Sequence, residues 1–141
     1  MRLDGRLSRM LHVLLHMGRR EDPLTSETIA KMLGTNPGVI RRTMAGLRDS
    51  GYVAAEKGHG GGWTLRRPLA EITLWEVYRA LGAPRLFALG NPTDSGICPL
   101  ERVAEAALDE GFAAASAAFG AHLKEITLAE LFAQAEGQRP G

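Results

Sequence analysis

The chain has 141 residues, of which 45% are hydrophobic, with a net charge of +1 and one cysteine. This length fits one compact domain, or one domain with an extension. No apolar run approaches the ~18 residues of a membrane span, and a single cysteine excludes an intramolecular disulfide and an all-cysteine metal site. Because we see no secretory signal peptide and almost no cysteine, we expect a cytoplasmic protein.

The two halves of the chain differ in charge. Residues 1–67 carry 12 Lys and Arg against 6 Asp and Glu, whereas residues 68–141 carry 5 against 10. A basic half favours a polyanionic partner, because neutralised phosphates release counterions on binding. Unequal charge on solvated helices is the simpler interpretation, and charge alone does not separate the two. The acidic half is expected to lie away from nucleic acid.

The first predicted helix spans residues 3–18. Hydrophobic residues recur there at spacings of three and four, which indicates a core-facing stripe: Leu3, Leu7, Met10, Leu11, Leu14 and Leu15. Arginines lie on its other faces and could approach phosphates: Arg2, Arg6 and Arg9. His12 and His16 are one turn apart, which is also a metal-ligand spacing. Packing or exposure to solvent is the simpler role for such a pair.

A second, shorter helix is predicted from Thr25 or Ser26 to Leu33. Either hydroxyl can cap its start, and Leu24 is placed to pack back against it. Gly34 ends the helix, because glycine readily adopts the left-handed conformation found at helix C-termini.

The third helix is predicted from Pro37 to about Ser50. Asn36 is a good N-cap, and proline is tolerated in the first helical turn. Its outward face is basic, with Arg41, Arg42 and Arg48. Two helices joined by so short a turn, the second one basic, predict a helix-turn-helix. Such a second helix fits the major groove, where an arginine can bond both acceptors of a guanine.

A β-hairpin is predicted around Lys57–Trp63, in which four of seven residues are glycine. Short β-prone runs flank this loop on both sides, with Tyr52, Val53 and Leu65 as the expected core contacts. Basic side chains at the tip and on the return strand could contact phosphates or the minor groove: Lys57, His59, Arg66 and Arg67. A nucleotide-binding loop is discounted, because its glycines would lead into a helix rather than a strand.

Two capping boxes predict helices in the second half of the chain. Thr73 with Glu76 opens one near residue 74, and Thr127 with Glu130 opens another near residue 128. We interpret the pair as one local solution used twice, not as a domain repeat.

A long helix is predicted over residues 99–119, after an irregular segment that ends at Ile97. Pro99 marks its first turn, so Cys98 lies at or beside the N-cap. One face carries apolar, mostly small side chains: Leu100, Val103, Ala104, Ala107, Leu108, Ala114, Ala115 and Ala118. Because so small a domain cannot bury this face alone, we expect a homodimer through this helix, with the 128–135 helix beside it.

Taken together, these motifs resemble the Rrf2 family of bacterial transcriptional regulators over almost the whole chain. The matching residues are Ile29-Ala30, Gly34-Thr35-Asn36-Pro37, Val39-Ile40-Arg41-Arg42, Leu47, Gly51-Tyr52-Val53, Gly58 with Gly60-Gly61-Gly62, Leu65, Ile72-Thr73-Leu74, Cys98-Pro99 and Ile126-Thr127-Leu128-Ala129-Glu130-Leu131. The resemblance implies a homodimeric winged helix-turn-helix protein that is mainly α-helical with a small β-hairpin wing. Its second motif helix would read the major groove, and its wing would touch the minor groove.

The resemblance assigns recognition positions to Asn36, Pro37, Val39, Arg41 and Arg42, and the wing tip to Lys57, His59 and Gly60. Our predicted DNA-binding residues also include Thr25, Ser26, Gly38, Arg48, Gly61 and Arg66. Many relatives hold an iron–sulfur cluster through three cysteines, but only Cys98 is present here. A three-cysteine site is therefore excluded and no cofactor or metal is predicted. A cluster held by Cys98 with His12 or with groups of a second subunit is the remaining alternative.

Cys98 has two possible roles. A thiol at a helix N-terminus can have a lowered pKa and act as a redox or electrophile sensor, or it can be a small buried hydrophobe. An enzyme with Cys98 as nucleophile is disfavoured, because no base lies near it in sequence.

We predict a homodimeric, sequence-specific DNA-binding regulator that binds a palindromic operator and responds to oxidants or electrophiles through Cys98. We expect a repressor, and an activator stays open as an alternative. Residues 1–83 would form the DNA-binding domain, 84–98 a sensor loop and 99–141 the dimerisation helices. A winged-helix adaptor that binds protein instead of DNA stays open as an alternative.

Overall fold

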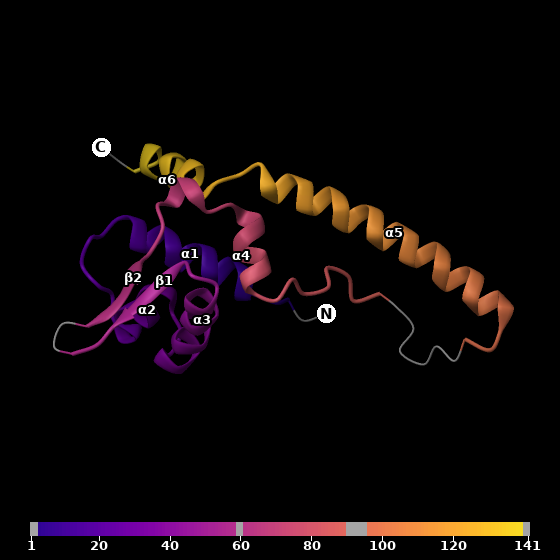
Figure 1. Ribbon diagram of the computed structural model, residues 1–141, viewed down its shortest axis with the longest axis horizontal. Helices are drawn as coiled ribbons and strands as arrows, with labels where there is room; N and C mark the ends of the chain where they lie inside the picture. The colour runs from indigo at the N-terminus through magenta and orange to yellow at the C-terminus, as the bar shows by residue number, and fades with distance from the viewer. Residues whose placement is uncertain (1–2, 59–60, 90–95, 140–141) are drawn as a thin grey trace.

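The computed structural model describes residues 3–58, 61–89 and 96–139. The described chain is mainly helical, with one antiparallel hairpin (Figure 1). Its elements in order are α1 (Arg6–Gly18), α2 (Ser26–Leu33), α3 (Pro37–Asp49), β1 (Val53–Glu56), β2 (Gly62–Leu65), the short 3-10 helix η1 (Leu69–Glu71), α4 (Leu74–Ala80), α5 (Pro99–Lys124) and α6 (Leu128–Gly137). The predicted fold class, mainly α with a small β wing, is confirmed.

Helix α1 is the central element of the core. Met10, Val13, Leu14 and Met17 are buried along it. The prediction that the helix begins at Leu3 is wrong, since Leu3 is 90% exposed and α1 begins at Arg6. The Asp4 carboxylate accepts a hydrogen bond from the Arg6 backbone N–H at 3.0 Å, which closes a turn before the helix starts.

The helix-turn-helix forms as its capping residues predict. Thr25 Oγ1 accepts a hydrogen bond from the Thr28 N–H at 3.1 Å, and Asn36 Oδ1 accepts one from the Val39 N–H at 3.0 Å. Gly34 ends α2 with a φ of +67°, a left-handed conformation that favours glycine. The inner face of α3 is fully buried at Ile40, Met44 and Leu47, which fixes the orientation of its outer face.

The hairpin is anchored to the start of α2. Strands β1 and β2 pair from Val53 opposite Leu65 to Glu56 opposite Gly62. The backbones of Trp63 and Leu24 exchange two hydrogen bonds, at 2.8 and 3.0 Å. A side chain at Gly62 would place its Cβ 2.6 Å from the Leu24 carbonyl oxygen, so only glycine permits this approach.

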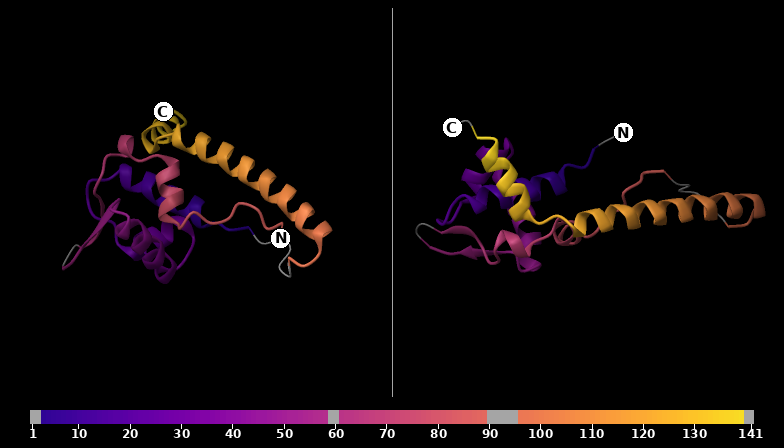
Figure 2. Two further views of the ribbon diagram at one scale, coloured as in Figure 1. Left: turned by 45° about the vertical axis from the view of Figure 1, so that its right-hand side comes forward. Right: turned by 90° about the horizontal axis from the view of Figure 1, so that it is seen from above.

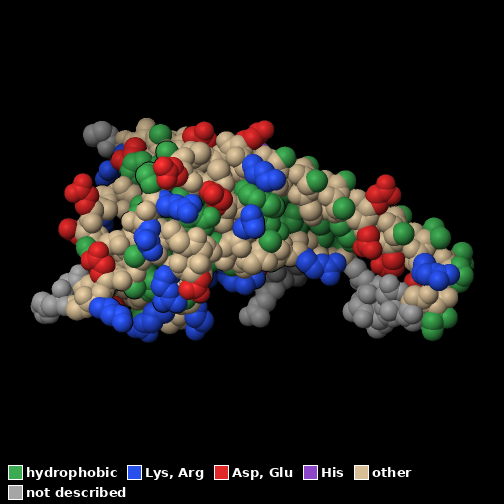
Figure 3. Space-filling model, in the orientation of Figure 1, with side chains coloured by type: hydrophobic (Ala, Val, Ile, Leu, Met, Phe, Trp, Pro, Cys, Tyr) green, Lys and Arg blue, Asp and Glu red, His purple; other side chains and the backbone are tan. Residues whose placement is uncertain are grey.

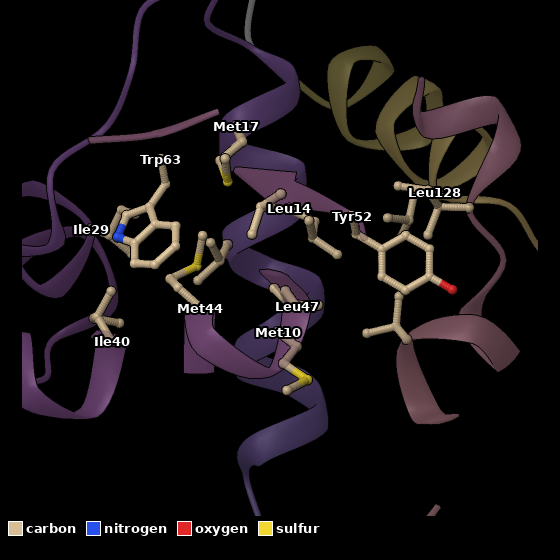
Figure 4. Close-up of a cluster of buried hydrophobic side chains, with 14 of the residues drawn as sticks. Met10, Leu14, Met17, Ile29, Ile40, Met44, Leu47, Tyr52, Trp63 and Leu128 are labelled. Carbon is tan, nitrogen blue, oxygen red and sulfur yellow. The ribbon is translucent and has the colours of Figure 1, made fainter. Parts of the chain in front are cut away.

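Buried side chains from all of these elements meet in one core. Figure 4 shows Leu14 and Met17 of α1 beside Met44 and Leu47 of α3, with Trp63 of the hairpin on one side and Leu128 of α6 on the other. Tyr52 and Val53 are buried as predicted, while Leu65 is half-buried. Trp63, which is 9% exposed, is the main apolar contact of β2.

The two capping boxes are confirmed, and they pair with each other. The Leu74 N–H donates to the Ile126 carbonyl at 3.0 Å, and the Leu128 N–H donates to the Ile72 carbonyl at 2.8 Å. This bridge holds α6 near the start of α4. Helix α6 packs against α1 and η1, so the prediction that it lies beside the long helix is wrong. The proposed domain boundaries stay a prediction.

Helix α5 is longer than predicted and projects from the body (Figure 2). It has 26 residues and ends at Lys124 rather than Phe119. Gly120 lies within this helix and faces Trp75 of α4, whose ring lies 3.0 Å from where a Cβ would be, so a side chain here would crowd the ring. Tyr78 and Phe119 add an edge-to-face ring contact, with centroids 5.9 Å apart. In the described segments, no helix is long and apolar enough to cross a membrane.

Candidate nucleic-acid interface

The exposed face of α3 carries the predicted recognition arginines. Arg41 and Arg48 have side chains that are 60% and 50% exposed, and Arg42 is also exposed. Arg41 pairs with Glu27 of α2 at 3.2 Å, and Arg48 pairs with Asp49 at 3.3 Å. Exposed pairs of this kind contribute little to stability. Both arginines can therefore exchange a carboxylate for a DNA phosphate or a base edge at small cost.

Other predicted contact residues have polar atoms that are already engaged inside the fold. The Thr25 hydroxyl and the Asn36 amide oxygen cap α2 and α3. Ser26 Oγ accepts a hydrogen bond from the Trp63 indole N–H at 3.0 Å. Pro37, Gly38 and Val39 are half-buried in the first turn of α3. These residues shape and orient the motif, whereas the arginines carry its charge.

The wing presents Lys57 and Arg66 to solvent. Gly58 has a φ of +99°, a conformation that favours glycine, and the Gly61 N–H donates to the Gly58 carbonyl oxygen at 3.0 Å. Two predicted tip residues, His59 and Gly60, lie outside the described residues. On the return side, the Arg67 guanidinium lies 5.6 Å from the centre of the Tyr52 ring.

Charge separates on the face of the molecule that Figure 3 shows. In Figure 3, Lys and Arg side chains gather along the lower edge, under α2 and α3, while most visible Asp and Glu side chains lie above this edge or along α5. The positive half found in the sequence thus becomes a positive edge in space. Such an edge attracts polyanions and is the electrostatic footprint of nucleic-acid binding.

A hollow of about 500 Å³ lies between α1, α3 and the end of α4. Arg6 and Arg9 of α1 and Arg42 of α3 line it. Arg6 is also held by Asp4 in a two-pronged pair with a shortest distance of 2.6 Å. The hydrogen bonds from Arg6 lower the pKa of the Asp4 carboxyl to about 2.

Cys98 is exposed at the N-cap of α5, so it is not a buried core residue. The backbone N–H groups of Glu101 and Leu100, in that order, lower the pKa of its thiol. The lowered pKa favours the nucleophilic thiolate.

The donor set does not fit a cluster that needs three thiolates, because the chain has one cysteine. His12 and His16 do meet, with their Nε2 atoms 3.0 Å apart. Within the described residues, no group of three or more His, Cys, Asp and Glu could hold a metal ion. The prediction of no cofactor stays a prediction.

Comparison with known proteins settles the family. Residues 3–134 match the Rrf2 family, which is described as iron-dependent transcriptional regulators. The chain belongs to the Rrf2 family. The resemblance predicted from the motifs is thereby confirmed, and members of this family are transcriptional regulators rather than enzymes.

Two relatives and one solved structure show how far the similarity extends. YwnA of Bacillus subtilis, a candidate HTH-type transcriptional regulator, is 34% identical over 112 residues, or 78% of this chain and 81% of YwnA. YwgB of the same organism, also a candidate HTH-type regulator, is 35% identical over 83 residues, or 57% of this chain and 53% of YwgB. The chain thus matches about half the length of YwgB. A candidate regulator from Lactobacillus plantarum shares the fold, with a TM-score of 0.81, 24% identity and coverage of 96% and 93%.

For an Rrf2 regulator, the structure adds two features to the predicted site. Trp63 was not among the predicted residues, although it ties the wing to α2 through Ser26. For Arg6 and Arg9, the sequence predicted only that they could approach phosphates. It did not predict that they line one hollow together with Arg42. A tryptophan directly after a glycine loop was the available signal for the first feature. The hollow could not be predicted in this way, because it depends on the angle at which α1 packs on α3, and no local sequence pattern determines that angle.

Proposed function

We propose that this Rrf2 protein is a homodimeric, sequence-specific DNA-binding repressor. Helix α3 would enter the major groove, with Arg41 and Arg42 at base edges or phosphates, and Lys57 would bring the wing to the minor groove. The carrying observation is the exposed basic face of α3, held outward by the buried Ile40 and Leu47 on its other side. Repression follows from occlusion of the DNA that the dimer covers.

Dimerisation is proposed through α5. Leu100, Val103 and Leu108 are 82%, 71% and 46% exposed on this helix. Among its 26 residues, Gly120 and Leu123 are the buried ones. An apolar face of this kind on a regulator is best explained by a second copy of the same helix. A homodimer in turn favours a palindromic operator, because two-fold protein symmetry is mirrored in the site.

The test of DNA readout is Arg41→Ala, measured by fluorescence anisotropy on the specific site and on random duplex. Loss of a base-contacting arginine should weaken specific binding by about 1–3 kcal/mol and relax sequence preference. Lys57→Ala is the contrast variant, which should weaken binding to all duplexes alike. Equal affinity of wild type and Arg41→Ala for the specific site would refute this assignment.

The protein-binding adaptor is separated from the DNA reader by a salt titration on random duplex. A DNA reader loses affinity steeply as salt rises, because bound counterions are released. An adaptor has no reason to bind duplex at low salt. Binding that is absent at low salt would support the adaptor.

Cys98 is proposed as the signal-sensing residue. Its exposure and the N–H groups that lower its pKa favour reaction with an oxidant or electrophile. Wild type should lose operator affinity after peroxide treatment, and Cys98→Ser should keep it. Equal peroxide sensitivity in both proteins would end the sensor proposal. A colourless protein after anaerobic purification would support the absence of an iron–sulfur cluster, and a coloured one would contradict it.

A further inference from the structure

We propose that the hollow lined by Arg6, Arg9 and Arg42 binds a phosphate of the DNA backbone. The contact would lie on the opposite side of the recognition helix from the wing. The proposal rests on the DNA-binding function above and deepens it, since it adds α1 to the interface. The protein would then hold DNA at three places: wing, α3 and the hollow.

The hollow is built from packed elements. Its walls are the first turns of α1 and the outer flank of α3, and Ala80 and Leu81 of the α4 end complete it. Helices α1, α3 and α4 approach closely here: a Cβ on Gly46 would lie 3.4 Å from Met10 Cε and 3.6 Å from the Ala80 carbonyl oxygen. Buried Met10 belongs to the lining as well, so the hollow is bounded by core packing on the side of α1.

The charges in the hollow favour an anion. Three arginines are among its lining residues, and no Asp or Glu is, within the described parts of the chain. Arg6 is paired with Asp4, which lies outside the lining, whereas Arg9 and Arg42 form no ion pair in the described parts of the chain. Like charges around one hollow repel one another, and a bound anion relieves that repulsion. The planar guanidinium fork matches phosphate oxygens two at a time.

The position of the hollow selects the DNA backbone as the source of that phosphate. Val39 and Arg42 belong both to its lining and to the N-terminal half of α3, the part of a recognition helix that meets the groove. In Figure 1 the wing lies on one side of α3 and the N-terminal part of the chain on the other. A duplex with α3 in its major groove therefore brings one backbone toward the wing and the other toward the hollow.

The experiment is the salt dependence of binding to random duplex for wild type, Arg9→Gln and Arg139→Gln. Arg139→Gln removes the same charge at the far end of the chain, from an exposed pair with Glu136. Loss of one phosphate contact should reduce the slope of log affinity against log salt by about 0.9 for each bound copy. If wild type and Arg9→Gln bind equally at 1 M salt, this change in slope makes Arg9→Gln bind about eightfold more weakly than wild type, per copy, at ~0.1 M salt. Arg9→Lys keeps the charge and should keep the slope.

The outcomes separate this proposal from the proposed function. If wild type shows no salt-dependent duplex binding, the DNA-binding function itself fails. If wild type binds with a steep slope and Arg9→Gln keeps that slope, the hollow proposal alone is overturned. A third arm titrates wild type and Arg9→Gln with pyrophosphate by calorimetry, without DNA. Tight pyrophosphate binding that Arg9→Gln abolishes, with an unchanged DNA slope, would assign the hollow to a free anion and overturn the DNA source.

Asp4→Asn is a second variant that keeps the fold, because the amide oxygen can still accept the Arg6 backbone N–H. It removes the carboxylate that competes with phosphate for Arg6. Binding to random duplex should become roughly two- to threefold tighter per copy. Weaker binding by this variant would count against a phosphate at Arg6.

Discussion

The winged-helix body and helix α5 bury their apolar side chains to very different extents. In the body, α1 and α3 each place core residues fully inside, with Leu14, Ile40 and Leu47 at 0% exposure. Helix α5 is twice as long as α1, yet Leu100 and Val103 remain 82% and 71% exposed. The body therefore buries its core within one chain, whereas α5 leaves exposed the apolar face that we propose for dimerisation. If α5 dimerises as proposed, folding and assembly depend on separate surfaces, which substitutions can address one at a time.

The largest expected effect is a loss of unfolding free energy when a cavity is made in the core of the body. Leu14→Ala removes a fully buried side chain at the centre of the core, and such a cavity costs about 2–5 kcal/mol. Leu3→Ala makes the same chemical change at a site that is 90% exposed and should stay within ~0.5 kcal/mol of wild type. Urea denaturation followed by circular dichroism measures both. Equal midpoints for the two variants would show that the described core does not hold the body together.

The next effect concerns α5. Leu100→Glu combined with Val103→Glu puts two charges in the proposed dimer interface, where unpaired burial costs several kcal/mol. The dimer dissociation constant should rise by at least ~100-fold, measured by sedimentation velocity, while the circular dichroism of the body stays normal. Ala106→Glu with Ala113→Glu, two exposed positions on other faces of α5, is the matched control and should remain dimeric. If both double variants dissociated to the same extent, the proposal that the Leu100 and Val103 face of α5 forms the dimer interface would be contradicted.

A smaller effect is expected where the wing meets the body. Trp63→Phe keeps an aromatic ring but removes the N–H that donates to Ser26 Oγ, at a cost of about 0.5–1.5 kcal/mol in unfolding free energy. In a double-mutant cycle, Ser26→Ala should add little to Trp63→Phe, because both remove one bond. Fully additive losses would mean that the two side chains do not interact.

The smallest effect is a pH dependence at His16. Burial, then the charges of His12 and Arg19, lower the pKa of His16 in the folded protein. The folded state therefore favours neutral His16, so this stability is present above the usual histidine pKa of about 6.5 and is lost as the pH falls through the lowered folded value. The urea midpoint should decline from pH 7.5 to pH 5, and His16→Gln should flatten that decline more than His122→Gln does. An equal decline in both variants would contradict this origin.

How much the sequence could predict depended on the range of the interaction. The caps at Thr25, Asn36, Thr73 and Thr127 were predicted because each acts within three residues along the chain. The place of α6 was not predictable, because it is set by a bridge between residues that lie more than 50 positions apart. The α5 end was misplaced by five residues, because the packing of Gly120 against Trp75 of α4 joins positions that lie far apart in the sequence.

The residues of the candidate site also differ in whether short-range sequence patterns could predict them. The exposed arginines of α3 followed from helical periodicity and proved to be outward-facing. The hollow did not follow, because Arg9 and Arg42 are 33 positions apart and meet only through the packing of α1 on α3. Contact residues on one element can be predicted from its own sequence, whereas sites shared between elements need the fold.

The most direct test of the account is selection of bound duplexes from a random pool by the full-length protein, followed by sequencing. A homodimer that reads bases through α3 should enrich an inverted repeat with half-sites about one or two helical turns, roughly 10 or 20 bp, apart. Arg41→Ala should lose the preference at one position in each half-site while still binding duplex at low salt. Absence of any enriched sequence from the wild-type selection would contradict the central claim that this protein is a sequence-specific, dimeric DNA reader.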